Sequence, residues 1–168
     1  MAKIKICGLK RLDDIEIVNK YKPDYIGFVF ADSKRKVTSD LACKMKKNLD
    51  SSIKSVGVFV DEDIDVIIKL YDEGIIDIAQ LHGLENEEYI KKLKQKSNYQ
   101  LEIINAIEMS DEKDLKKEFF LAGGLNSKNI SKAIEEFNPY AVDLSSGVET
   151  DGYKDELKIK EVMEEVDG

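Results

Sequence analysis

Short apolar runs alternate along this chain with amphipathic segments, and this alternation constrains the fold more than any other feature. The runs predicted to be strands are Lys3–Cys7, Tyr25–Phe30, Ser55–Val60, Ile76–Leu81, Leu101–Ile107, Phe119–Ala122 and Ala141–Leu144. Runs that are mostly apolar are typical of parallel strands covered on both faces. Pro23 and Pro139 stand just before two of these runs, where a proline ends the preceding helix and needs no ladder partner.

The segments between the runs carry apolar residues at helical spacing. We expect core-facing stripes at Leu12, Ile15 and Val18; at Ile64, Ile67, Ile68 and Tyr71, with Gly74 as the C-terminal cap; and at Ile130, Ala133, Ile134 and Phe137. Strand–helix units repeated every roughly 20–25 residues predict the α/β class and favour closure into a (β/α)8 TIM barrel. Because no low-complexity linker divides the 168 residues, we expect a single (β/α) barrel domain over residues 1–168.

The number of predicted strands is one short of that barrel, which needs eight. A helix is predicted over residues 110–117, and only Glu118 separates it from the strand that begins at Phe119. One residue is too short a connection to bring the chain back from the end of a helix into a new strand. We therefore predict that one βα unit is missing between Lys117 and Phe119, and that a complete chain is heavier than 19.1 kDa.

Composition excludes several classes of partner. Asp and Glu outnumber Lys and Arg by 34 to 26, and the resulting formal net charge of −8 disfavours nucleic acid or an anionic membrane surface. No apolar run approaches the roughly 18 residues of a membrane span, and the first residues predict a strand, not a signal peptide. Two cysteines without metal-ligand spacing and a single histidine disfavour a structural zinc site. We expect a cytoplasmic protein with reduced thiols.

Two of the predicted strands end in glycine-bearing turns. One stops at Gly123-Gly124 and the other at Ser145-Ser146-Gly147, and a helical pattern follows each. A strand-to-helix turn leaves backbone N–H groups unpaired at the positive end of the helix dipole, where anions bind. A pair of such turns late in a βα-repeating chain matches the phosphate site of barrel enzymes. We expect Gly123, Gly124, Ser146 and Gly147 to hold the phosphate of a small-molecule substrate.

Reactive groups of such barrels lie at the carboxyl ends of the strands. Cys7 ends the first predicted strand; its thiol could act as a base or nucleophile if a cation lowers its pKa, or it could be a small buried hydrophobic residue. Arg35 could face a substrate carboxylate, or it could be a solvated member of a basic run. Cys43 falls within the amphipathic segment Asp40–Leu49, so we expect it to be structural.

Three further polar residues occupy strand ends. Gln80 and the single histidine, His82, could contact a ligand or could simply satisfy hydrogen bonds where the strand stops. Asp143 ends a strand beside the serine-rich turn, where a carboxylate can position a substrate hydroxyl or amine, or cap the turn.

Ordered motifs lie at successive predicted strand ends. They are Lys5-Ile6-Cys7-Gly8, Gly27-Phe28-Val29-Phe30 with Ser33 and Arg35, Val56-Gly57-Val58-Phe59, Gln80-Leu81-His82-Gly83, Leu121-Ala122-Gly123-Gly124-Leu125 and Asp143-Leu144-Ser145-Ser146-Gly147-Val148-Glu149, followed by Gly152 and Lys154-Asp155. In this order they resemble the phosphoribosylanthranilate isomerase family of tryptophan biosynthesis. The resemblance implies a (β/α)8 barrel and an Amadori rearrangement of N-(5-phosphoribosyl)anthranilate to 1-(2-carboxyphenylamino)-1-deoxyribulose 5-phosphate. It implies no metal or organic cofactor, and we expect a monomer or homodimer.

The same resemblance implies a role for each candidate residue. Cys7 would be the general base that removes the proton from ribose C2 after the ring opens. Arg35 would face the anthranilate carboxylate and Asp143 the anthranilate amine. Gln80 and His82 would line the mouth of the site.

One feature of the family has no match here. Family members carry a general-acid aspartate at the end of the sixth strand, followed by a glycine-rich phosphate loop, and both belong to the unit that is missing. Two interpretations remain. The chain is an isomerase and its sequence lacks a stretch that contains the acid, or it is a non-catalytic barrel that binds a sugar phosphate and has no such acid. Indole-glycerol-phosphate synthase would need catalytic lysines at strand ends, and ribulose-phosphate epimerase a metal site with several histidines; neither pattern is visible.

Overall fold

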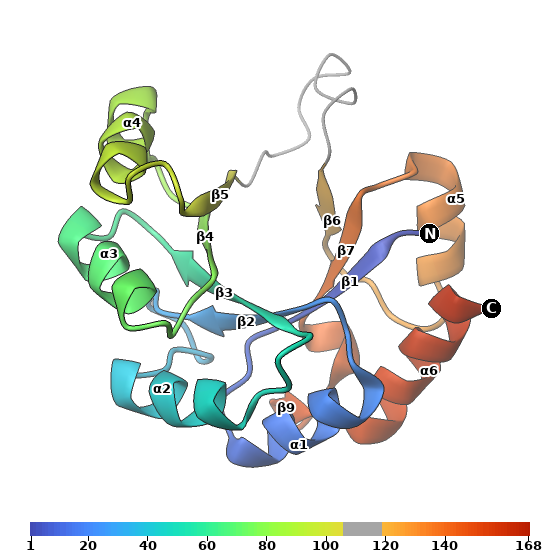
Figure 1. Cartoon of the computed structure of the whole chain (residues 1–168). Helices are drawn as coiled ribbons and strands as arrows, with labels where there is room; N and C mark the ends of the chain where they lie inside the picture. The colour runs from blue at the N-terminus through green and yellow to red at the C-terminus, as the bar shows by residue number, and fades with distance from the viewer. Residues whose placement is uncertain (106–118) are drawn as a thin grey trace.

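A curled sheet of seven parallel strands forms the centre of the protein (Figure 1). This computed structural model describes residues 1–105 and 119–168. The strands are β1 (Lys3–Cys7), β2 (Tyr25–Val29), β3 (Lys54–Phe59), β4 (Ile78–Leu81), β5 (Glu102–Asn105), β6 (Phe120–Ala122) and β7 (Ala141–Leu144), paired in the order β5-β4-β3-β2-β1-β7-β6. All ladders between them are parallel, so the carboxyl ends of the strands meet at one rim of the sheet.

Helices cover the convex side of the curled sheet (Figure 1). They are α1 (Leu12–Tyr21), α2 (Ser39–Asn48), α3 (Ile64–Asp72), α4 (Glu87–Lys96), α5 (Ile130–Phe137) and α6 (Glu156–Asp167). Side chains of Thr38, Asp63 and Asn86 accept hydrogen bonds from the first turns of α2, α3 and α4, which fixes where these helices begin. None of the helices in the described ranges is long and apolar enough to cross a membrane.

The sheet separates two apolar layers. Ile4 and Ile6 of β1 pack into the large cluster between the sheet and the helices. A smaller cluster of Tyr25, Val56 and Ile78 fills the concave interior. Because side chains alternate along a strand, the odd-numbered residues of β1 face that interior. A polar residue at an odd position of β1 therefore points into the barrel.

The predicted elements match the structure closely, with two corrections. β1 and β7 have the predicted bounds, and Gly74 adopts a left-handed conformation (φ 74°) next to Glu73, the C-cap residue of α3, as expected of a glycine that closes a helix. The predictions for Leu12 and Phe137 are wrong: these residues are 45% and 37% exposed, whereas Ile15, Val18 and Ile130 are buried. Asp14 takes the buried place in the first turn of α1, because its carboxylate accepts hydrogen bonds from the backbone N–H groups of residues 10 and 11.

The second correction concerns the segment after β7. The sequence predicts that a helical pattern follows the turn at Ser145, but only a single 3-10 turn, Ser146–Val148, forms there. An antiparallel hairpin of β8 (Glu149–Thr150) and β9 (Tyr153–Lys154) comes next, and α6 begins after it. Asp151 and Gly152 make the hairpin possible with positive φ values of 53° and 80°.

The sheet has two edges. Among the described residues, β5 pairs only with β4, and β6 pairs only with β7 (Figure 1). The predicted strand Leu101–Ile107 is described as far as Asn105, and the helix predicted over residues 110–117 lies outside the described residues. Seven paired strands in the described ranges agree with the count from the sequence, and the missing eighth strand belongs between β5 and β6.

Candidate active site at the carboxyl ends of the strands

A cavity of about 280 Å³ opens at the rim where the parallel strands end. Four predicted site residues line it: Cys7 at the end of β1, Gln80 on β4, His82 just beyond β4, and Asp143 on β7. Both glycine turns line it as well, through Gly123, Gly124, Ser146 and Gly147. The structure thus gathers into one cavity every predicted site residue except Arg35.

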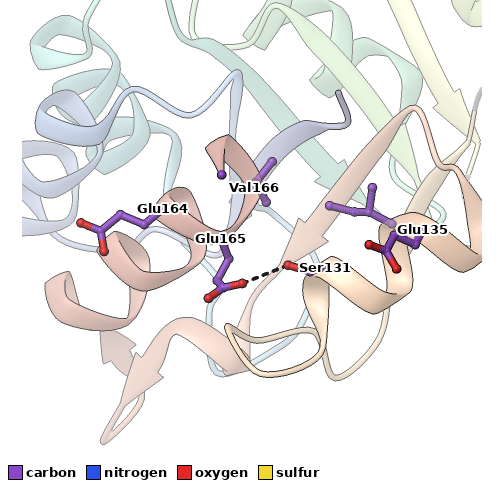
Figure 2. A pocket seen from close by; sticks show the side chains of 7 residues that line it. Ser131, Glu135, Glu164, Glu165 and Val166 are labelled. Carbon is purple, nitrogen blue, oxygen red and sulfur yellow. Dashed lines mark hydrogen bonds between the residues drawn. The ribbon is translucent and has the colours of Figure 1, made fainter.

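A larger hollow of about 400 Å³ lies elsewhere, between α5 and α6 (Figure 2). Its walls carry Glu135, Glu164 and Glu165, and the hydroxyl of Ser131 donates a hydrogen bond to Glu165. No predicted site residue lines it, and it is remote from the strand ends where barrel enzymes place their chemistry. The smaller, strand-end cavity is therefore the candidate site.

Cys7 has room in the cavity because of a glycine on the neighbouring strand. A Cβ atom at Gly27 would lie 2.6 Å from the Cys7 sulfur, so any other residue there would displace the thiol. Burial raises the pKa of the Cys7 thiol above its ordinary value, while the ammonium groups of Lys5 and Lys154 act in the opposite direction. Cys43, by contrast, packs from α2 against the core on the helix side of the sheet, as expected for a structural cysteine.

Lys5 is the residue of this site that the sequence analysis missed. Its side chain is fully buried, and its ammonium donates to the amide oxygen of Gln80 at 2.6 Å and to the carboxylate of Asp143 at 2.7 Å. Lys5 was named only as the first residue of a family motif, with no role; the signal for a role was its place two residues before Cys7 in an apolar strand, which puts both side chains on one face. Gln80 and Asp143 are therefore hydrogen-bonded within the protein as well as lining the cavity.

Arg35 does not line the cavity but is bound beside it. Its guanidinium donates through Nε and one terminal nitrogen to the Glu149 carboxylate, at 2.8 and 3.1 Å. The ammonium of Lys154, almost fully buried, donates to the same carboxylate at 2.6 Å. Burial raises the pKa of Glu149, but the hydrogen bonds from Arg35 and Lys154 outweigh burial and lower that pKa to about 2. Arg35 is therefore not a solvated member of a basic run, which was one of the two interpretations of the sequence.

The two glycine turns touch each other. A Cβ atom at Gly147 would lie 1.8 Å from the backbone oxygen of Leu125, so only glycine permits this approach. The side-chain amides of Asn126 and Asn129 donate to the carbonyl of Gly124, which fixes the orientation of that peptide. Within residues 1–105 and 119–168, the backbone N–H groups of Gly123, Gly124 and Gly147 donate to no protein acceptor.

These groups can hold an anion and move a proton. Unpaired N–H groups that converge from two turns can bind an anion, and a thiol beside buried ammonium groups can exist as a thiolate. Within the described part of the chain, no group of three or more His, Cys, Asp or Glu side chains is arranged to hold a metal ion. A curled parallel sheet with this cavity at its carboxyl rim is typical of an enzyme of the (β/α) barrel class.

Comparison with known proteins assigns the chain within that class. The profile of N-(5'phosphoribosyl)anthranilate (PRA) isomerase matches residues 4–117 and 101–165, and the chain belongs to this family, the isomerases of tryptophan biosynthesis. An N-(5'-phosphoribosyl)anthranilate isomerase of Clostridium acetobutylicum is 46% identical over 199 aligned positions, which cover 97% of each chain. A relative of the same name from Endomicrobium trichonymphae is 42% identical over 196 positions, again covering 97% of each chain.

Solved structures support the same family assignment. A structure of monomers of the dimeric phosphoribosylanthranilate isomerase from Thermotoga maritima superposes with a TM-score of 0.88 at 30% identity, covering 100% of both chains. A phosphoribosylanthranilate isomerase in complex with reduced 1-(o-carboxyphenylamino)-1-deoxyribulose 5-phosphate gives a TM-score of 0.89 at 30% identity, with the same coverage.

The aligned relatives contain an internal stretch of sequence that this chain lacks. The alignment to the Clostridium protein has 199 positions, although this chain has 168 residues, so a stretch of that relative has no counterpart here. The family profile matches in two pieces that overlap at residues 101–117, next to the point where the sequence analysis finds a unit missing. The alignment exceeds the length of this chain by 31 positions, enough for one strand–helix unit of roughly 20–25 residues with its loops.

Proposed function

We propose that the strand-end cavity binds N-(5-phosphoribosyl)anthranilate with its phosphate between the two glycine turns and its ribose beside Cys7. The observation that carries this proposal is that Cys7, Asp143 and both glycine turns line the same cavity. The net charge of −8 makes a general attraction for an anion weak, so the phosphate depends on local N–H groups.

Cys7 is the general base in this proposal. After the ribose ring opens, the substrate is an iminium between C1 and the anthranilate nitrogen. The Cys7 thiolate takes the proton from C2 and becomes a thiol, while the C2–H electron pair forms the C1=C2 bond and neutralises the nitrogen. Protonation of C1 and loss of the C2 hydroxyl proton then give the ketone. Asp143 accepts a hydrogen bond from the anthranilate N–H, and Lys5 holds its carboxylate in place.

Arg35 binds the anthranilate carboxylate in this arrangement. Its Nε and one terminal nitrogen are occupied by Glu149, which fixes the guanidinium plane at the rim of the cavity. The other terminal nitrogen donates to no acceptor among the described residues and is left for the substrate. Gln80 and His82 line the mouth, and His82 is the more exposed of the two.

A second candidate is binding without turnover. It is favoured by one observation: the aligned relatives contain a stretch that this chain lacks, and the sheet is unpaired between β5 and β6 in the described ranges. The resemblance puts the general acid that opens the ribose ring in that stretch. Cys7 alone cannot supply this proton, since it must be a thiolate to act as the base.

Two measurements on residues 1–168 separate the candidates. Calorimetric titration with reduced 1-(o-carboxyphenylamino)-1-deoxyribulose 5-phosphate tests the site, and a fluorescence assay of phosphoribosylanthranilate consumption tests turnover. Binding with turnover supports the isomerase, and binding without turnover supports the second candidate. Absence of binding by a folded chain would contradict the proposed site.

A further inference from the structure

A lysine is fully buried in the interior of the barrel, and its position calls for an explanation. Lys5 lies near the middle of the sheet on β1, and its side chain has no exposed surface. Removing an ammonium from water is costly unless charges and hydrogen bonds compensate, and a hydrophobic residue of similar size would avoid this cost. The neighbouring strand β7 supplies one carboxylate oxygen, from Asp143, and β4, on the other side of β2 and β3 in the sheet, supplies one amide oxygen, from Gln80.

The charges around Cys7 do not cancel among the described residues. The charged groups that face it are Lys5 on β1, Asp143 on β7, Lys154 on β9 and Arg35, whose partner is Glu149; the imidazole of His82 also lines the cavity. Lys154 and Arg35 share the single carboxylate of Glu149, whereas Lys5 pairs with Asp143. Three cations therefore stand against two carboxylates, and a thiolate at Cys7 makes the charges equal.

We propose that Lys5 is a positioning residue that provides the countercharge for the Cys7 thiolate while it holds Asp143 toward the cavity. Lys5 and Cys7 are two residues apart on one strand, so both side chains point into the interior from the same face. The inference rests on the proposed role of Cys7 as the base, and it identifies the group that allows this half-buried thiol to lose its proton.

The test measures the ionisation of Cys7 directly. In a Cys43→Ser background only Cys7 can react, and the rate of its alkylation by iodoacetamide as a function of pH gives the thiol pKa. We expect Lys5→Met to raise that pKa by about one unit or more, a tenfold loss of thiolate at a fixed pH below the pKa. The readout needs no turnover, so it applies even if the chain lacks the general acid.

Lys3→Met is the matched control. Lys3 lies on the same face of β1, about 13 Å along the strand from Cys7, and its ammonium stands 4.9 Å from the centre of the Tyr140 ring. Lys3→Met removes one positive charge from β1, as Lys5→Met does. We expect the pKa of Cys7 to stay within about 0.3 units, because a charge at that distance is largely screened.

The double variant Lys5→Met/Asp143→Asn separates electrostatics from lost packing. It leaves no unpaired buried carboxylate, so it is expected to fold even if Lys5→Met does not. The pKa of Cys7 should rank lowest in the parent, higher in the double variant and highest in Lys5→Met. An unchanged pKa in the Lys5 variants, or equal effects of Lys3→Met and Lys5→Met, would overturn the inference. If the ranking holds but Cys7→Ser keeps full turnover, the charge assignment stands and the role of Cys7 as the base fails.

Discussion

At the scale of single residues, the side chains of β1 contribute to both the hydrophobic core and the candidate site. Ile4 and Ile6 bury against the helices, while Lys5 and Cys7 face the interior, so one five-residue strand contributes to both the core and the site. The sulfur of Cys7 reaches the cavity only because Gly27 has no side chain. Chemistry at Cys7 is therefore tied to the packing of β1 on β2.

The proposed base makes a direct prediction for Cys7→Ser. A serine hydroxyl is far too weak an acid to replace a thiolate, so turnover should fall by about 10²–10⁴-fold, while binding of the reduced product analogue changes by less than about threefold. Steady-state kinetics and calorimetry measure the two effects. Cys43→Ser is the control and should keep turnover nearly intact. Full turnover by a folded Cys7→Ser chain would refute the assignment.

The raised pKa of Cys7 predicts how turnover depends on pH. Burial disfavours the thiolate, so the fraction of active base should increase with pH until it passes a thiol pKa above the ordinary value. The rate should rise by up to tenfold per pH unit below that pKa and level off above it. The profile of kcat/KM checks this, and a rate that falls between pH 7 and pH 9 would contradict it.

Glu149 predicts a pH dependence of stability. Its pKa of about 2 in the folded protein lies below the unfolded value of about 4.3, so its contribution is complete above pH 5 and is lost as pH falls toward 2. At pH 7 that contribution is about 3 kcal/mol of unfolding free energy. Glu149→Gln should therefore destabilise the protein at pH 7 by about twice as much as at pH 3, as measured by urea unfolding. Equal destabilisation at both pH values would show that Glu149 is not an ionic partner of Arg35 and Lys154.

At the scale of elements, the turns after β6 and β7 form one unit, since the Gly147 backbone rests against the carbonyl of Leu125. The strands themselves could be predicted, because buried parallel strands leave unbroken apolar runs. The hairpin after β7 could not, because it consists of two-residue strands within a polar segment. The pairing of Arg35 with Glu149 was also missed, since a charged residue is solvated by default and its partner lies 114 positions away.

The proposed phosphate cradle predicts the effect of Gly124→Ala. Gly124 has a φ of 65° with no atom within 4 Å of an added Cβ, and Gly74 has a φ of 74° with equally open space. Both alanine variants should therefore lose stability by about the same amount, roughly 1 kcal/mol. Only Gly124→Ala should weaken binding of the reduced product analogue, by about tenfold, because it distorts N–H groups in the cavity. Thermal unfolding and calorimetry measure the two effects, and equal binding by both variants would contradict a backbone cradle.

At the scale of the whole molecule, the described sheet has two edges where the family resemblance implies a closed barrel. An unpaired strand edge is prone to pair with another chain. The relatives contain a further stretch at this place in the alignment, and the resemblance assigns the general acid to it. If this resemblance holds, barrel closure and the general acid depend on the same missing unit.

Restoring that unit is the prediction at this scale. Inserting the unmatched stretch of the Clostridium acetobutylicum relative between Lys117 and Phe119 should raise turnover by about 10²-fold or more, a typical contribution of a general acid. It should also reduce self-association, which analytical ultracentrifugation measures. A glycine–serine insert of equal length is the control and should do neither. A parent chain of 168 residues that turns over as fast as the chimera would show that no acid is missing.

The contact between the two turns would link a bound ligand to an edge strand of the sheet. β6 is three residues long with one neighbour among the described strands, and Gly123 and Gly124 continue directly from it. A phosphate bound to both turns would join this edge strand to the segment after β7, adding a free energy that grows as RT ln(1 + [L]/Kd). Amide hydrogen exchange over residues 120–125 should therefore slow on addition of the analogue far more than exchange in β2 and β3. Bound substrate would therefore stabilise the edge strand β6 of the same sheet that binds it.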